Sequence, residues 1–213
     1  MAVTAPLPTD ERVQLTGISW ATYETLRAEL DLSRRGFRLS YYQGNLEIMA
    51  PSPEHERLKK AAGRFVETLA EELEIQIEPF GSTTLKRPEL AGAEPDECFY
   101  VRNLAAVRGL KRIDLSQDPP PDLAVEIDIT NPSSRRLPIY ESIGVPEVWR
   151  FDGQQLRIYG LGNDGYSERE QSQVFPMIPV HEIAGFLRQV TEVDYLTLVQ
   201  MFRQWVRQQI GIG

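Results

Sequence analysis

The sequence predicts an α/β domain in which a mixed β-sheet is flanked by helices. Residues 52–73 carry an apolar stripe with the period of an α-helix, and a second stripe of this kind lies near the C-terminus. Between the two stripes, several short runs alternate apolar and polar side chains or are wholly apolar, as strands are. Helix-like and strand-like segments are mixed along the chain without an internal repeat or a low-complexity linker, which favours one layered domain.

The composition is that of a globular protein with a sizeable core. The chain has 213 residues, of which 41% are hydrophobic and 25% are charged. No apolar run reaches the roughly 20 residues of a membrane helix, and the N-terminus lacks the apolar core of a signal peptide. We therefore expect a cytoplasmic protein with a flexible N-terminal tail over residues 1–16 and a single domain over residues 17–210.

Charge and cysteine content exclude several classes of function. The formal net charge is −8, which disfavours a generic high-affinity nucleic-acid binder but still allows a local basic groove. Cys98 is the sole cysteine, so an internal disulfide is impossible. One cysteine and two histidines cannot build a Cys/His zinc site.

Two helices are predicted in the first third of the chain. Residues 19–30 have apolar side chains every three to four positions, and Ser19 can cap this helix. Residues 52–73 form the clearest helix, because Ser52 can cap it and Pro53 suits its first position.

Short strands flank the second helix. Residues 37–51 form two alternating runs about Gly44-Asn45, which is the turn chemistry of a β-hairpin. Two more short strands, 74–80 and 82–87, are joined around a glycine.

Two further strands are predicted in the middle of the chain, over residues 94–101 and 123–130. The connection between them ends in three consecutive prolines, which cannot lie in the interior of a strand. Strand 123–130 has a wholly apolar set of alternate residues, so one of its faces should be buried.

The last third of the sequence is expected to form a short helix, a hairpin and a helical C-terminal part. Pro138 is tolerated only in the first turn of a short helix over 137–143. Residues 145–161 pair as a hairpin, and 165–170 add an edge strand. From about residue 181 the chain is helical. One face of this last helix carries Tyr195, Leu198, Val199, Phe202, Trp205 and Val206, a stripe typical of core or of a dimer contact.

Two acidic residues interrupt the apolar run 123–130. Side chains alternate between the faces of a strand, so Glu126 and Asp128 share one face, with Cα atoms roughly 6.7 Å apart. Carboxylates at this spacing can converge on one cation, and without a cation their repulsion would raise a pKa. The alternative is a strand with one solvated face, on which acids need no functional explanation.

Asp96, at the start of strand 94–101, adds a third carboxylate. If this strand neighbours strand 123–130, Asp96 meets Glu126 and Asp128 at the strand ends. Ligands that offer only oxygen suit Mg²⁺, Mn²⁺ or Ca²⁺ rather than zinc. A metal held in this way polarises a phosphoryl oxygen and generates hydroxide, which is the chemistry of phosphodiester hydrolysis.

At these residues the sequence resembles the PD-(D/E)XK nuclease superfamily. Pro95-Asp96 is followed, about thirty residues later, by Glu126-x-Asp128 after an apolar strand. The phrases GNLEIMAPSPEHERL, PDLAVEIDIT and YESIGVPEVWRFDG resemble more closely the Uma-type family of "putative restriction endonucleases", a bacterial group catalogued as a domain of unknown function. This resemblance covers roughly residues 17–205.

The resemblance implies a restriction-endonuclease-like fold, with a central mixed β-sheet flanked by helices. It also implies that Asp96 and Glu126 are the first and second ligands of Mg²⁺ or Mn²⁺. The third position of the motif is normally a lysine that stabilises negative charge, and here it is Asp128. Asp128 is then a further metal ligand and a candidate catalytic residue.

The missing positive charge has two candidates, Arg135 and Arg136. We prefer Arg136 as the catalytic residue, because it lies four residues before Tyr140, where related sequences often place a lysine. An arginine can stabilise phosphate charge but cannot act as a general base at neutral pH.

Glu47 and His55 are supporting candidates. Glu47 could supply another acid to the site, or it could be a lone acid on a solvated strand. His55 lies in the first turn of the helix over 52–73, where the positive helix end favours a neutral ring. Its ring could bond a catalytic carboxylate or a substrate phosphate, or simply a nearby backbone carbonyl.

The sequence therefore predicts a metal-dependent DNA endonuclease that cuts as a homodimer. The C-terminal stripe and the hairpin over 147–160 are the candidate dimer contacts. One alternative is a catalytically silent nucleic-acid-binding or regulatory module that retains the nuclease fold, which the missing motif lysine and the acidic charge favour. Another is an oligomeric interaction protein whose acids bind a structural cation.

Overall fold

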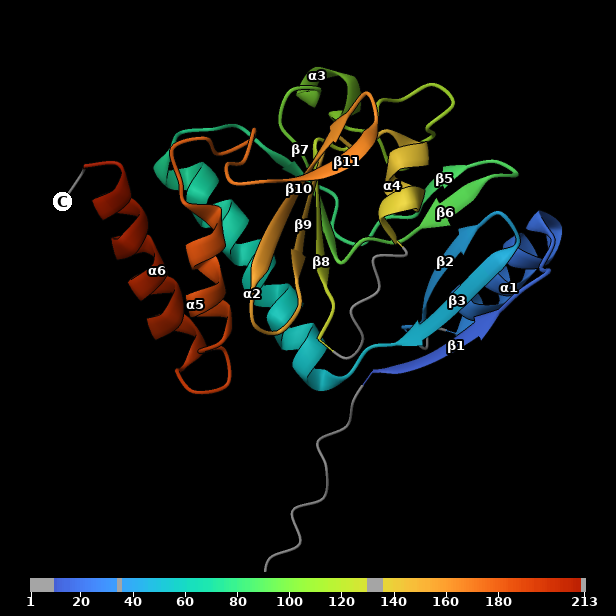
Figure 1. The fold of residues 1–213 in the computed structure, drawn as a ribbon, viewed down its shortest axis with the longest axis horizontal. Coiled ribbons are helices and arrows are strands. Elements are labelled where there is room, and N and C mark those ends of the chain that lie inside the picture. Colours follow the sequence, from blue (N-terminus) through green and yellow to red (C-terminus); the bar gives the residue numbers. More distant parts are fainter. Residues whose placement is uncertain (1–9, 34–35, 130–135, 212–213) are drawn as a thin grey trace, which may run out of the picture.

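The structure, a computed structural model, describes residues 10–33, 36–129 and 136–211. Two β-sheets lie beside each other, and helices pack on both (Figure 1). The predicted α/β class is therefore confirmed, but the strands divide between two sheets instead of forming one central sheet. The predicted boundaries of a single domain over 17–210 stay a prediction.

The first sheet is built from the N-terminal part of the chain and carries one helix. Its strands stand in the order β1-β3-β2-β6-β5, and all neighbouring pairs are antiparallel. The helix and two of the strands pack their apolar side chains together in a small core. The elements are β1 (Glu11–Leu15), α1 (Trp20–Ser33), β2 (Arg38–Tyr42), β3 (Asn45–Ala50), β5 (Leu85–Arg87) and β6 (Ala91–Ala93).

Strand β1 corrects the prediction of a flexible tail over residues 1–16. Residues Glu11–Leu15 pair antiparallel with β3, from Glu11 opposite Ala50 to Leu15 opposite Leu46. The backbone hydrogen bonds of this strand come from a segment more than thirty positions away, so local composition did not reveal them. Residues 1–9 lie outside the described part of the chain.

The turn between β2 and β3 lies one residue earlier than predicted. Tyr42 pairs with Asn45, so the two turn residues are Gln43 and Gly44. Both have positive φ, +47° and +84°, as a type I′ hairpin turn requires at its two central positions. Gly44 therefore takes the second position of the turn.

The second sheet contains the strands that carry the predicted acids. Its order is β11-β10-β9-β8-β7-β4. The β8–β9 pair is parallel and the other described pairs are antiparallel, so the sheet is mixed, as predicted. The strands are β4 (Glu78–Pro79), β7 (Glu97–Tyr100), β8 (Leu123–Ile127), β9 (Glu147–Phe151), β10 (Leu156–Gly162) and β11 (Gly165–Arg169).

Several predicted strands differ from those in the structure. The strands predicted around Gly81 become β4 and β5, which belong to different sheets. Strand β8 ends at Ile127, so Asp128 lies just beyond it. Strands β7 and β8 are antiparallel neighbours, with Glu97 opposite Val125, and the condition for bringing Asp96 near β8 is met.

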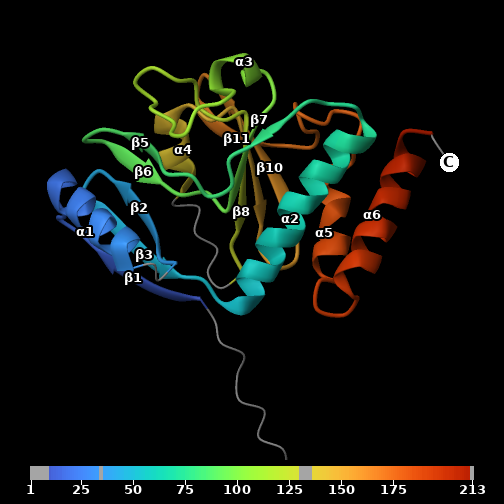
Figure 2. The ribbon, with the colours of Figure 1, turned by 180° about the vertical axis from the view of Figure 1, so that it is seen from behind.

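Helices cover both faces of the second sheet. Figures 1 and 2 show α2, α5 and α6 on one face and α4 on the other, between the two sheets. The α2 face carries the largest apolar cluster, and a second cluster joins α4 to both sheets. The remaining elements are α2 (Pro53–Glu72), α3 (Leu104–Val107), α4 (Leu137–Ile143), η2 (Val180–Glu182), α5 (Ile183–Leu187) and α6 (Tyr195–Gln209).

The C-terminal apolar stripe is part of the core. Leu198, Val199, Phe202 and Val206 are buried, and the Phe202 ring stacks on Phe65 of α2 with centroids 4.2 Å apart. Of the two predictions for this stripe, core packing is confirmed for these four residues. Among the described helices, none is long and apolar enough to cross a membrane.

Candidate functional site

Strand β8 lies at the centre of the candidate site, and its side chains alternate as predicted. Leu123, Val125 and Ile127 belong to the cluster on the α2 side, whereas Ala124 belongs to the cluster around α4. Glu126 and Asp128 therefore lie on the α4 side. They are only 5% and 6% exposed, so the alternative of a solvated strand face is wrong.

Glu126 is held at both carboxylate oxygens by residues at the start of α4. Arg136 Nη1 donates to Oε2 at 2.6 Å, and the Tyr140 hydroxyl donates to Oε1. Arg136 and Tyr140 are one helical turn apart, so both side chains reach β8 from the same side. The prediction that Arg136 supplies a cation near Glu126 agrees with this contact. Arg135 lies outside the described residues.

Burial shifts the titration of both donors. Burial and the charge of Glu126 raise the pKa of Tyr140 well above its ordinary value, so its hydroxyl stays protonated. Burial by itself lowers the pKa of Arg136, but its interactions with Glu126, Tyr140 and Glu47 together outweigh burial and raise that pKa. Near neutral pH both groups therefore keep their protons and donate to Glu126.

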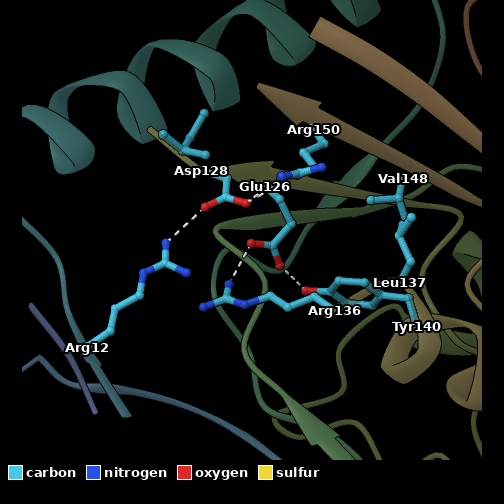
Figure 3. A pocket seen from close by; sticks show the side chains of 9 residues that line it. Arg12, Glu126, Asp128, Arg136, Leu137, Tyr140, Val148 and Arg150 are labelled. Carbon is cyan, nitrogen blue, oxygen red and sulfur yellow. Dashed lines mark hydrogen bonds and ion pairs between the residues drawn. The ribbon is translucent and has the colours of Figure 1, made fainter. Parts of the chain in front are cut away.

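Asp128 lies between two other arginines. Arg150 on β9 donates to its Oδ2 through Nε at 3.2 Å and Nη2 at 2.8 Å. Arg12 on β1 donates through Nη2 to Oδ1 at 3.0 Å. Figure 3 shows that these arginines and Arg136 point toward the two carboxylates from different elements.

Asp96 lies in a neighbouring polar network and is completely buried. Its Oδ2 accepts a hydrogen bond from the backbone N–H of Ile127 at 2.6 Å, which ties it to β8. Its Oδ1 contacts Arg38 of β2 and lies 2.8 Å from His55 Nε2. Asp96 is therefore adjacent to β8, but it does not line the pocket that Glu126 and Asp128 share.

His55 bridges two carboxylates at the start of α2. Its Nε2 faces Asp96, and its Nδ1 lies 3.1 Å from Asp10 Oδ2. Of the two alternatives for this ring, bonding to a carboxylate is the observed one. His55 Nε2 also lies 3.4 Å from Arg38 Nη1, a donor, and the neutral ring predicted from the helix end stays a prediction.

Asp10 is the second anchor of this histidine. Burial by itself would raise the pKa of the Asp10 carboxyl. The contacts with His55 and with Ser52, which include a hydrogen bond from the Ser52 backbone N–H, together outweigh burial. The pKa of Asp10 therefore lies below its ordinary value. Ser52 also caps α2 by accepting from the His55 backbone N–H at 3.2 Å. The cap predicted from the sequence therefore also positions His55.

Glu47 reaches the same arginines from β3. Its Oε1 lies 3.3 Å from Arg136 Nη2 and 3.6 Å from Arg12 Nη1. The side chain is 11% exposed, so it is not a lone acid on a solvated strand. Glu47 therefore neutralises the guanidinium groups from the side of the first sheet.

The three predicted metal ligands, Asp96, Glu126 and Asp128, offer only carboxylate oxygens. Carboxylate oxygens suit Mg²⁺ or Mn²⁺. However, each predicted ligand already has a guanidinium partner: Arg38 for Asp96, Arg136 for Glu126, and Arg12 with Arg150 for Asp128. Across residues 10–33, 36–129 and 136–211, no three His, Cys, Asp or Glu side chains are grouped to hold a metal. The three carboxylates do not fit a shared ion in this arrangement.

Sequence reasoning missed Asp10, Arg12, Arg38 and Arg150 as members of the site. Arg150 lies between Trp149 and Phe151 in β9, and Arg38 begins β2 directly before Leu39, so a charge beside apolar strand residues was a usable signal. Arg12 and Asp10 lie in the segment taken for a tail, where the sequence carried no comparable signal.

The mixed sheet with helices on both faces gives the chain a restriction-endonuclease-like fold, and a buried acid pair lies at the end of one of its inner strands. A crystal structure of a "putative nuclease belonging to DUF820" from Anabaena variabilis has this fold, with a TM-score of 0.50 and 13% identity over 89% of this chain and 99% of that chain. The chain belongs to the Uma2 family, whose sequence model, described as "Putative restriction endonuclease", matches residues 20–191. No curated protein matches the chain. The resemblance stated from the sequence is confirmed.

Proposed function

We propose that the chain is a DNA endonuclease that hydrolyses phosphodiester bonds at the pocket lined by Glu126, Asp128 and Arg136. The observation that carries this proposal is the contact of Arg136 Nη1 with Glu126 Oε2 at 2.6 Å. The contact places the buried guanidinium of Arg136 beside Glu126. Arg136 lies outside the PD-(D/E)XK motif, and Glu126 is one of its carboxylates. Membership of the Uma2 family and the nuclease fold support the same function.

Different residues of the pocket would stabilise the developing negative charge and accept the proton of the attacking water. Hydrolysis builds negative charge on the phosphoryl oxygens, and Arg136 would stabilise that charge because it is a fixed cation in a buried site. An arginine does not release its proton at neutral pH, so a carboxylate has to take the proton of the attacking water. We assign that role to Asp128, which can take the proton once Arg12 or Arg150 releases one of its oxygens.

We also propose that activity depends on Mg²⁺ or Mn²⁺. The acids on this side of β8 offer only oxygen donors, and a bound ion would polarise the phosphoryl oxygen. Asp96, Glu126 and Asp128 are the ligands we propose. All three carboxylates are held by arginines in this arrangement, so ion binding requires a rearrangement in which the arginines release them.

Nicking of supercoiled plasmid DNA tests the endonuclease proposal. Wild-type protein should nick the plasmid with Mn²⁺ at low salt, because an acidic protein binds DNA weakly when salt screens its few basic contacts. Glu126→Gln should abolish nicking, while the matched control Glu168→Gln, an exposed acid on β11, should keep it. Equal nicking by wild type and Glu126→Gln would assign the activity to a contaminant and remove the proposal.

Two observations favour the second candidate, a catalytically silent nucleic-acid-binding or regulatory module. Each predicted ligand already has a guanidinium partner, and the pocket volume of about 10 Å³ holds about one water molecule. A silent module would retain DNA in a binding assay and would not nick it with Mg²⁺ or Mn²⁺. A DNA-binding assay and a nicking assay together therefore distinguish the two candidate functions.

A further inference from the structure

Two buried guanidinium nitrogens in the pocket have no hydrogen-bond acceptor. Within the described residues, Arg12 Nε and Arg136 Nε are both shielded from solvent and unpartnered. Both arginines line the pocket that contains Glu126 and Asp128. A buried donor without an acceptor destabilises a protein, so two in one pocket require an explanation.

The terminal nitrogens of these arginines are already used. Arg12 donates to Asp128 through Nη2, and Arg136 donates to Glu126 and Glu47 through Nη1 and Nη2. A guanidinium carries five N–H donors in a planar fork, so the Nε–H groups remain for another acceptor. The protein supplies the charges and holds both side chains, but not the oxygen that these donors need.

The surroundings indicate the kind of oxygen. The pocket wall carries Arg12, Arg136 and Arg150 against two carboxylates, while Glu47 offsets part of this positive charge from outside the pocket. The two directed Nε–H donors, and not the net charge of the pocket, therefore indicate the ligand. The free volume of about 10 Å³ admits one water-sized group, such as a single phosphoryl oxygen. Guanidinium groups bond charged oxygens more strongly than neutral ones.

We propose that Arg12 and Arg136 form a seat for a non-bridging oxygen of a nucleic-acid phosphate, which they contact through their Nε–H groups. The choice of a nucleic acid rests on the proposed function, whereas the seat itself rests on the two donors. Arg12 comes from the first sheet and Arg136 from the start of α4, as Figure 3 shows for their side chains. The phosphate thus bridges two parts of the fold, and Arg12 becomes a substrate-contacting residue in addition to Arg136.

Binding without a divalent ion separates this seat from catalysis. Inorganic phosphate and a short single-stranded oligonucleotide serve as probes in the presence of EDTA. Arg12→Lys and Arg136→Lys keep the positive charge and remove the Nε–H group, so each should weaken binding of both probes about tenfold or more. The matched control Arg157→Lys, at a half-exposed ion pair on β10, should bind as wild type does. If wild type and both pocket variants bind the probes with equal affinity, the proposed seat is overturned. The seat is also overturned if Arg157→Lys loses as much affinity as the pocket variants do.

A measurement on the unaltered chain covers the case in which a variant does not fold. In ¹⁵N-resolved spectra, the Nε–H signals of Arg12 and Arg136 should shift on addition of phosphate and not on addition of chloride at the same ionic strength. Unchanged signals would overturn the seat. Binding of phosphate but not of the oligonucleotide would support the seat and reject DNA as its source. Phosphate-dependent shifts in a protein that never nicks DNA would leave the seat standing and remove the proposed function.

Discussion

Arg12 and Asp128 are 116 positions apart in the sequence, yet Arg12 Nη2 donates to Asp128 Oδ1 at 3.0 Å. The contact joins β1 of the first sheet to the end of β8 in the second. Both side chains are less than 10% exposed, so little solvent screens their attraction. Arg12 therefore contributes to the stability of the fold and to the electrostatics of the pocket at the same time.

Removal of Arg12 should destabilise the protein measurably. Asp128 keeps Arg150 as a partner, so we expect Arg12→Gln to lower the free energy of unfolding by about 1–3 kcal/mol and not by the larger loss of a fully unpaired buried charge. Urea unfolding of Arg12→Gln, Asp128→Asn and the double variant gives the coupling free energy. Arg157→Gln, which breaks a more exposed pair with Asp152, should cost about 1 kcal/mol or less. Strict additivity of the two pocket substitutions would contradict the contact.

The charge of Arg136 should matter more to activity than its shape. Arg136→Ala should reduce Mn²⁺-dependent plasmid nicking about 10²-fold or more, because it removes a cation from the place where negative charge develops. Arg136→Lys should keep part of the activity. Thermal unfolding of both variants controls for loss of structure. If Arg136→Ala nicks as well as wild type, the endonuclease proposal survives and the role of Arg136 does not.

Divalent ions should bind to the predicted carboxylates. Titration calorimetry with Mn²⁺ should give heat for wild type and none for Asp96→Asn or Asp128→Asn. Binding should be weak, since the ion has to displace guanidinium groups that already contact these carboxylates. Equal Mn²⁺ binding by wild type and both variants would place any ion elsewhere.

The Asp10–His55 contact should make stability depend on pH. The pKa of Asp10 is lowered in the folded protein, so its contribution is present above its unfolded pKa of about 4 and is lost as pH falls through the folded value. Asp10→Asn should therefore lower the free energy of unfolding by about 2 kcal/mol near pH 7. The difference from wild type should shrink as the pH is lowered below about 4. A difference that stays constant over this range would show that Asp10 does not titrate in the predicted way.

We expect the protein to be a homodimer, because cleavage of both DNA strands commonly uses two active sites. Multi-angle light scattering at micromolar concentration should give twice the chain mass of 24.3 kDa. The buried part of the α6 stripe is no longer a candidate contact. Leu196, which is 69% exposed on the same helix, is a better one, and Leu196→Asp should favour the monomer. A wild-type mass of 24.3 kDa would contradict the dimer.

Local sequence patterns determined most of the elements and the centre of the site. The alternation along β8 put Glu126 and Asp128 on one face, because a strand has a period of two whatever surrounds it. Ser52 and Pro53 marked the start of α2, and a spacing of four residues put Arg136 and Tyr140 on one side of a helix start. These features depend on neighbours within a few residues, so they can be predicted from the sequence alone.

Only the tertiary structure decided which charges meet. Arg12 reaches Asp128 because β1 pairs with β3, and Arg38 of β2 in the first sheet reaches Asp96, which precedes β7 of the second sheet. No local period relates these residues, and their attraction becomes strong only after folding removes the water between them. The sequence therefore determined three acids near the ends of two neighbouring strands. The packing of the first sheet against the second decided that each acid is held by an arginine, since a buried carboxylate without a cationic or hydrogen-bonding partner would be too costly to keep.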